Sequence, residues 1–358
     1  MSFFRSYSAR IVTLALCAGV ASAQTGAQSG NWTAPSGGYF YDSTNRSIRS
    51  LTGIIGSAVQ GPSVATGIDW ASVAPNQTSA LAQQNGSQIW IPDLSAAGTF
   101  QVLDRIPLAL QAFWAADSSQ AAILTEGGEL IWLTNFSSGP IPVSTWNLKS
   151  YGSSGSSQSS SRQSGEAGAI RIGRPQTSVV WSLLAADSRA DQVLLAAQTG
   201  EIWQLWFASS TVPPQNIPFS GRPAATVFSP GAGGIFVSDA AGHRVVQIQN
   251  PGTIPVLTNV ISSEAYVNDL AALAISSDGK RLFVADHSGS VIRVFDLSAI
   301  GASDSAPTAE LPTGAAPVSF TAFSSDRYIV NTGGSAGQPI FFLNTGVPSN
   351  MSFVPGER

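Results

Sequence analysis

The chain has 358 residues, of which 43% are hydrophobic and only 11% are charged. Its 35 glycines and 21 prolines favour strands and turns over helices, and no stretch after the N-terminal segment repeats apolar residues at helical spacing. The formal net charge of −4 argues against nucleic acid or an anionic membrane surface as a partner.

The first 23 residues have the pattern of an export signal. Arg5 and Arg10 provide positive charge, residues 11–20 form a short apolar run, and the small residues ending at Ala23 form a cleavage site. We therefore expect cleavage near Ala23 and a secreted or periplasmic mature protein. No later stretch of the sequence is long and apolar enough to be predicted as a membrane span.

Cys17 is the only cysteine, and it lies inside the predicted signal segment. The mature protein would then have no disulfide, no zinc–thiolate site and no cysteine nucleophile. Cleavage would also remove two of the 17 basic residues and none of the 21 acidic ones, which leaves a net charge of −6. The rival interpretation makes Cys17 a lipid-anchored terminus, although the cleavage pattern at Ala23 fits better.

After a Gly/Ser-rich lead-in at residues 24–38, residues 39–355 carry a repeat. Each copy ends in a turn followed by a short apolar strand, and the last turn residue marks the register. These marks are Asn45, Gly86, Gly128, Gly200, Gly242, Gly289 and Gly337. Five of the six intervals between them are 41, 42, 42, 47 and 48 residues long, which is the length of a four-stranded propeller blade. The remaining interval, of 72 residues, contains a Ser-rich stretch at 150–169, which we interpret as an insertion between blades three and four.

The clearest copy predicts three strands, at Leu270–Ile275, Leu282–Ala285 and Val291–Phe295, with turn residues between them. Blade one has no candidate first strand before Tyr39. Because an open ring would leave unpaired sheet edges, we predict that the C-terminal strand at residues 351–355 joins blade one. The sequence thus predicts an all-β, seven-bladed β-propeller closed by its C-terminal strand.

Two of the repeats resemble known propeller families. Residues 276–296, SSDGKRLFVADHSGSVIRVFD, resemble the YVTN-type repeat, and residues 234–248, GIFVSDAAGHRVVQI, are similar to the NHL-type repeat, as are residues 39–51. Blades two, three and four depart from the pattern, with Gln83, Thr125 and Ala197 in place of its aspartate. The resemblance implies a propeller architecture; such propellers include lactonases, lyases and dehydrogenases as well as binding scaffolds, so it implies no single activity.

Asp42, Asp239 and Asp286 stand at the same register position, and His287 follows Asp286. If these side chains converge at the channel mouth, they are candidate ligands for a divalent cation that polarises a lactone or carbonyl. The alternative is that each carboxylate accepts hydrogen bonds from its own turn. Recurrence of aspartate with the turn favours this second interpretation. His243 is the only other histidine.

Most tryptophans recur in the first and third strands of blades two to four, where they are expected to fill the wedge between blades. Trp114 and Trp181 are the candidates for a ligand-facing aromatic surface, because they lie in first strands.

The sequence contains no nucleophile elbow, zinc-protease pair or phosphate-binding loop. We therefore predict a monomeric, exported, non-catalytic scaffold that has no cofactor and binds a protein, peptide or glycan through its loop face. The alternative is a metal-assisted lactonase or lyase that uses the four candidate ligands.

Overall fold

A computed structural model of the chain describes 27 strands and one four-residue helix in seven sheets. The described residues are 36–53, 58–96, 98–152, 179–230, 234–299, 306–324, 326–332 and 339–355. The predicted signal segment and nearly all of the lead-in and the Ser-rich insertion lie outside these ranges. No helix within the described ranges is long and apolar enough to cross a membrane.

Each sheet is one blade, and its strands are hydrogen-bonded in chain order. Blade one contains β1 (Ser36–Asp42), β2 (Ser47–Thr52) and β3 (Val59–Thr66). Blade two contains β4 (Ile68–Val73), β5 (Ala80–Gln84), β6 (Ser87–Ile91) and β7 (Gln101–Val102). Blade three contains β8 (Ala109–Trp114), β9 (Gln120–Thr125), β10 (Glu129–Thr134) and β11 (Ile141–Asn147), followed by α1 (Lys149–Gly152).

The remaining four blades have the same plan. Blade four contains β12 (Val180–Ala186), β13 (Gln192–Thr199), β14 (Ile202–Ser209) and β15 (Gln215–Ile217). Blade five contains β16 (Pro223–Phe228), β17 (Ile235–Asp239), β18 (Arg244–Gln249) and β19 (Val256–Ile261). Blade six contains β20 (Leu270–Ile275), β21 (Arg281–Asp286), β22 (Val291–Asp296) and β23 (Ala309–Pro312). Blade seven contains β24 (Ser319–Ser324), β25 (Arg327–Asn331), β26 (Ile340–Asn344) and β27 (Asn350–Val354).

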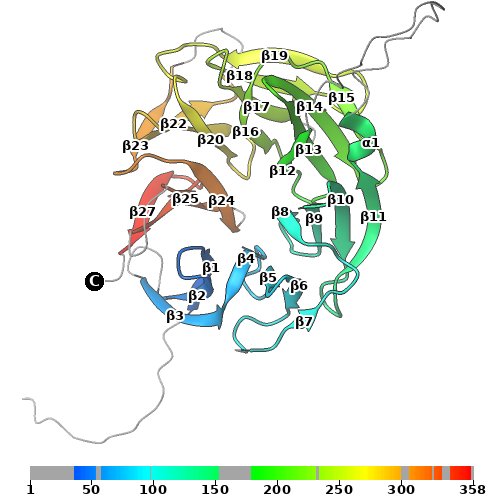
Figure 1. Cartoon of the computed structure of the whole chain (residues 1–358). Coiled ribbons are helices and arrows are strands. Elements are labelled where there is room, and N and C mark those ends of the chain that lie inside the picture. The colour runs from blue at the N-terminus through cyan, green and yellow to red at the C-terminus, as the bar shows by residue number, and fades with distance from the viewer. Residues whose placement is uncertain are drawn as a thin grey trace, which may run out of the picture. The chain divides into compact units, whose positions relative to one another are not determined.

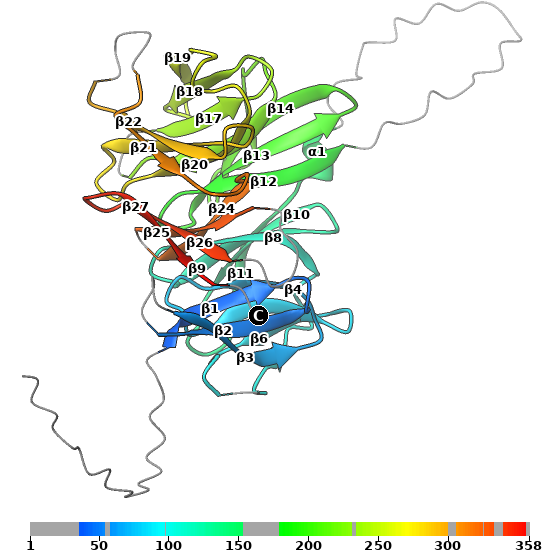
Figure 2. The ribbon, with the colours of Figure 1, turned by 90° about the vertical axis from the view of Figure 1, so that its left-hand side faces the viewer.

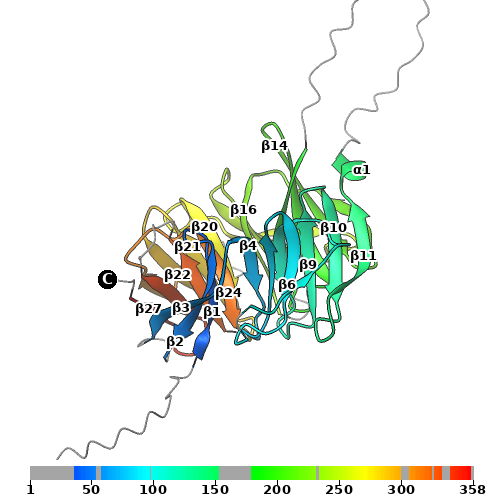
Figure 3. The ribbon, with the colours of Figure 1, turned by 60° about the horizontal axis from the view of Figure 1, so that its bottom comes forward.

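The seven sheets surround a common axis, with β1, β4, β8, β12, β16, β20 and β24 innermost (Figure 1). The prediction of an all-β, seven-bladed propeller is therefore confirmed. The first strands of the complete blades run in the same direction, so their N-terminal ends lie on one face of the ring. The turns between second and third strands lie on that face too, and we call it the turn face. Figure 3 shows α1 and the end of β14 on the same side.

Local chemistry explains the strand pattern of blade six, the clearest repeat. Ser276 and Asp278 close the first turn: the Ser276 hydroxyl donates to Asp278 Oδ1 (2.5 Å) and accepts from the Arg281 backbone N–H (3.0 Å). Gly279 adopts a φ of 70°, which a glycine reaches without steric cost. The apolar residues of β21 are buried on both faces, since the sheet packs between two neighbouring blades.

The core is a series of apolar layers between neighbouring blades. Between blades three and four, the layer includes Trp132, which is fully buried, together with Leu195 and Trp206. The Trp132 indole N–H donates to the Ala190 carbonyl of the next blade (2.9 Å). The regular tryptophans of blades two to four thus fill the wedges between sheets, as the sequence predicts.

The prediction that the C-terminal strand completes blade one is wrong. β27 pairs with β26 in blade seven, with Ile340 opposite Val354 and Asn344 opposite Asn350 (Figure 2). Only residues 345–349 connect the two strands, and so short a connection forms a hairpin within one sheet. Blade one therefore has three strands, and β1 lies innermost beside β4.

Side chains, not a shared strand, join blade seven to blade one. An apolar layer that includes Leu51, Phe323 and Val354 packs between the two sheets. Gln77, in the first turn of blade two, links three blades: its Oε1 accepts from the Tyr39 backbone N–H (2.6 Å), and its Nε2 donates to the Phe323 carbonyl (3.2 Å). We call this junction the seam.

Candidate functional site

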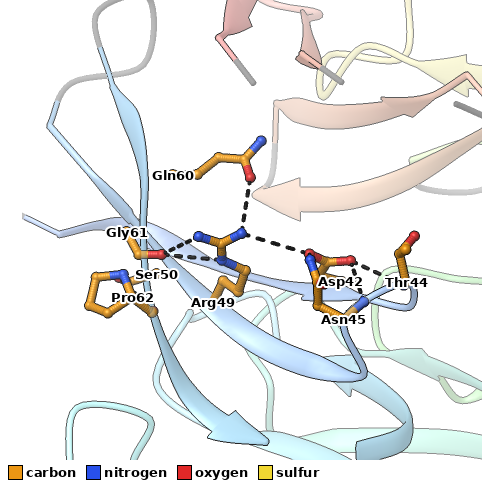
Figure 4. A network of polar contacts seen from close by, with 8 residues as sticks. All are labelled: Asp42, Thr44, Asn45, Arg49, Ser50, Gln60, Gly61 and Pro62. Atoms are coloured by element: carbon orange, nitrogen blue, oxygen red, sulfur yellow. Dashed lines mark hydrogen bonds and ion pairs between the residues drawn. The ribbon is translucent and has the colours of Figure 1, made fainter. Parts of the chain in front are cut away.

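The predicted ligand Asp42 serves its own turn and a neighbouring arginine (Figure 4). Its Oδ1 accepts from the backbone N–H groups of Thr44 and Asn45, both at 3.1 Å. The Arg49 guanidinium lies 3.8 Å from its Oδ2 and donates to the Gly61 carbonyl of β3 (3.0 and 3.2 Å). The carboxylate therefore ties the second-to-third turn to a cation that reaches the outer strand.

Blade six repeats this arrangement with shorter contacts. Asp286 accepts from the Ser288 hydroxyl (2.9 Å), from the Gly289 backbone N–H (3.2 Å) and from Arg293 Nη1 (2.5 Å). Arg293 also donates to Glu310 on β23 (3.0 Å). Burial alone would raise the pKa of Asp286, but these donors outweigh burial and hold that pKa below its ordinary value.

Blade five carries the third copy of this aspartate–arginine pair. Asp239, only 1% exposed, lies 3.0 Å from Arg244 Nε and accepts from the backbone N–H groups of Ala241 and Gly242 (3.1 Å each). The Arg222 backbone N–H adds a further donor at 3.0 Å. The turn-capping interpretation of the three aspartates is thus confirmed, and the structure adds an arginine partner in each case.

Where aspartate is replaced, other polar groups bind the same region. In blade two, Gln83 and Gln88 face each other across the hairpin. Gln83 Nε2 donates to the Ala109 carbonyl (2.6 Å), while Gln88 Oε1 accepts from the Ala109 N–H (3.0 Å), so this pair holds the start of the next blade. In blade three, Thr125 Oγ1 accepts from the Glu129 backbone N–H (3.1 Å).

Both histidines connect a turn to the next blade. His243 Nδ1 lies 2.8 Å from the Asn268 carbonyl, and His287 Nδ1 lies 3.0 Å from the Pro317 carbonyl. Because a carbonyl oxygen only accepts, Nδ1 must carry the proton in each ring. This leaves Nε2 as the basic nitrogen of both histidines.

The predicted metal ligands Asp42, Asp239, Asp286 and His287 are not brought together. Each aspartate belongs to its own blade and to its own arginine. Among the described residues, no group of three or more histidine, cysteine, aspartate or glutamate side chains is close enough to hold a metal ion. A cation would have to displace an arginine to reach any of the three carboxylates.

The two predicted ligand-facing tryptophans lie elsewhere than expected. Trp181 is only 8% exposed and packs edge-on against Trp206, with ring centroids 5.7 Å apart. Trp114 is half-buried; its indole N–H donates to Ser72 Oγ of blade two (3.0 Å), and its ring lies 4.6 Å from that of Phe136. Both rings are engaged between blades, because a large apolar ring gains more from the interblade wedge than from solvent.

Instead, aliphatic side chains are exposed where the innermost strands begin on the turn face. Leu110 in β8 is 48% exposed, Val180 in β12 is 57% exposed, and Val318, just before β24, is 45% exposed. Leu110 is the extra residue of a β-bulge, and Asp69 and Ala271 occupy the same bulge in β4 and β20. Bulges redirect side chains and are common beside binding sites.

Blades three and four add further exposed groups on the turn face. Ile202, at the start of β14, is 67% exposed. Glu126 and Glu201 lie in the adjoining turns and are exposed, and Glu129 is partly exposed. None of these three glutamates forms an ion pair with another described residue. We call Leu110, Val180 and Ile202, with Glu126 and Glu201, the blade three–four sector.

The structure also contains a cleft on the flank of blades one and two, with a volume of about 210 Å³. Ile68, Ile89, Leu94 and Phe100 contribute its apolar lining, and Asp93 is its only acidic residue. It has no histidine and no basic side chain, so it offers no set of groups for acid–base chemistry.

No protein-family model and no curated protein matches the chain. Solved structures do. A functionally unknown protein from Desulfotomaculum acetoxidans aligns with 11% identity and a TM-score of 0.52, over 89% of this chain and 100% of that one. A "putative 6-phosphogluconolactonase" from Bacteroides uniformis aligns with 12% identity and a TM-score of 0.54, over 88% and 93%. Its counterpart from Bacteroides fragilis gives 10%, 0.52, and 88% and 96%.

At such low identities these similarities concern the fold alone. The chain is thus a seven-bladed β-propeller that is structurally related to lactonase-type propellers.

Proposed function

We propose that this protein is an exported, non-catalytic propeller that binds a protein or peptide ligand on its turn face. The observation that carries the proposal is the exposure of Leu110, Val180 and Val318 at the start of three innermost strands. Large aliphatic side chains grouped on one face favour contact with another molecule, because their burial removes apolar surface from water.

The state of the acidic groups also favours binding over catalysis. A general base or metal ligand needs a free lone pair at the site. The Asp239 and Asp286 carboxylates instead accept bonds from turn groups and arginines. A sugar ligand is less favoured than a peptide, because Trp114 and Trp181 pack between blades and cannot stack freely on a ring.

Display selection on the purified mature protein tests the proposal. Peptide and protein-domain libraries would be panned against the wild type, and the selected binders remeasured on Val180→Asp and Val318→Asp variants. The matched controls are Ile254→Asp and Val347→Asp, because these side chains are 80% and 84% exposed and lie in third-to-fourth connections on the opposite face. We expect loss of binding only with the turn-face variants; equal loss with both pairs, or no selected binder, would contradict the proposal.

Metal addition separates the proposal from the lactonase alternative. Ca²⁺, Mg²⁺ or Mn²⁺ at millimolar concentration should leave the thermal midpoint unchanged, because an ion that binds only the folded state raises it. The enzyme alternative requires the opposite result: a metal-dependent midpoint, and hydrolysis of a lactone panel that Asp286→Ala abolishes.

A further inference from the structure

The exposed groups of blades three and four differ from the rest of the turn face in combining aliphatic side chains with free carboxylates. Leu110, Val180 and Ile202 are each about half or more exposed. β8 and β12 are neighbouring innermost strands, and their first residues lie at the same end of the ring. The three side chains therefore belong to one surface.

The carboxylates of this sector are placed by the turns that follow β9 and β13. The Glu126 backbone N–H donates to the Leu108 carbonyl (3.0 Å), which fixes the turn beside the start of β8. Glu201 immediately precedes Ile202. Each carboxylate thus lies at the border of an exposed aliphatic side chain in its own blade.

The charge of the sector is not neutralised locally. Asp42, Asp239 and Asp286 have arginine partners, and Asp69 is paired with Arg46. By contrast, Glu126 and Glu201 form no ion pair among the described residues, and the nearest placed cation, Lys149, lies over Gly128.

We propose that the blade three–four sector binds a peptide segment in which aliphatic residues alternate with arginine or lysine. This inference deepens the proposed function, on which it rests. The aliphatic side chains of the peptide would cover Leu110, Val180 and Ile202, and its cations would pair with Glu126 and Glu201. Complementary charge selects the partner and speeds encounter, while apolar burial supplies most of the affinity.

Peptides of defined composition test this directly. The probe is a fluorescein-labelled peptide with six alternating isoleucine and arginine residues between Gly-Ser ends, measured by fluorescence anisotropy on the full mature protein. One comparison peptide replaces arginine with glutamate, and another replaces isoleucine with serine. We expect binding of the first peptide only, and weaker binding as the salt concentration rises from 0.05 to 0.5 M, because salt screens exposed charges.

Protein variants locate the contact. Glu126→Gln with Glu201→Gln should weaken binding about fivefold at low salt, since each exposed ion pair contributes about 0.5 kcal/mol. The matched control removes two acidic charges from other parts of the same face, by Asp104→Asn with Glu264→Gln. Val180→Asp should weaken binding by at least about tenfold, because it places an unpaired carboxylate under the apolar side chains of the peptide. Unchanged unfolding midpoints would show that each variant folds.

The outcomes separate this inference from the function on which it rests. An equal loss in the two double variants means attraction by net charge alone and overturns the sector assignment. If the alternating peptide fails while display selection yields turn-face binders of another composition, this inference falls and the proposed function stands. If no ligand binds the turn face, both fall.

Discussion

The seam between blades seven and one allows a quantitative test through Gln77. In the structure the Gln77 amide makes two hydrogen bonds, one to Tyr39 of blade one and one to Phe323 of blade seven. Gln77→Ala removes both. At a net value of about 1 kcal/mol per hydrogen bond, the free energy of unfolding should fall by about 2 kcal/mol. For a protein of this size, the thermal midpoint should fall by roughly 4 °C.

The backbone at Gln77 adds a second, independent effect. Its φ of 61° lies in the left-handed region, where a residue with a Cβ atom pays a steric cost of about 1 kcal/mol. Gln77→Gly also removes the amide but relieves that cost. The glycine variant should therefore be about 1 kcal/mol more stable than the alanine variant.

Ser118 provides the matched control, because it occupies the same turn position in blade three, with a φ of 62°. Its hydroxyl accepts one hydrogen bond, from the Asn76 backbone N–H (2.9 Å), between blades that the chain already connects. Ser118→Ala should cost about 1 kcal/mol. Denaturant unfolding, followed by tryptophan fluorescence, measures all three variants. If Gln77→Ala costs no more than Ser118→Ala, the role assigned to the Gln77 amide is wrong.

Two further predictions concern charge and close packing. Since the pKa of Asp286 is lowered in the folded protein, its bonds stabilise the fold above about pH 4 and are lost as pH falls through that folded pKa. Asp286→Asn should thus cost about 3 kcal/mol at pH 7, by leaving Arg293 without its counter-ion, and should flatten the acid limb of a stability–pH curve; an unchanged slope would contradict this. A Cβ atom on Gly38 would lie 2.5 Å from the Phe323 ring, whereas one on Gly86 meets nothing within 4 Å. Gly38→Ala should therefore cost about 2 kcal/mol more than Gly86→Ala, and equal unfolding midpoints would show that the ring simply moves aside.

Much of the fold could be predicted because its signals are local. The hairpin over Leu270–Asp296 is specified by turn residues and by apolar runs of strand length, and the structure pairs Leu282 with Phe295 as that pattern requires. The outer strands carried weaker signals. β7 has two residues and β15 has three, and both are largely exposed, so neither shows an apolar pattern.

The closure of the ring was predicted incorrectly because strand propensity does not say which sheet a strand joins. The useful signal was the length of the connection: β26 and β27 are five residues apart, which favours a hairpin. Tertiary packing then made Gln77 a seam residue, and no feature of the sequence links it to Phe323, 246 positions away.

The candidate site shows the same division. Recurrence of aspartate with the turn correctly indicated capping, and the arginines were also visible, since Arg49 and Arg293 each follow their aspartate by seven residues. The exposure of Leu110 and Val180 was not predictable, because burial depends on how neighbouring blades meet. An aliphatic residue in a strand is ordinarily expected in the core.

The absence of a shared strand at the seam has a consequence for how this ring tolerates a change in chain order. The described chain begins and ends in blades one and seven, which are separate sheets and share no ladder. Circular permutation that joins residue 355 to residue 36 and opens the link at 103–108 would therefore leave every pair of hydrogen-bonded strands on one continuous segment. Only the position of the unlinked interface would move around the ring.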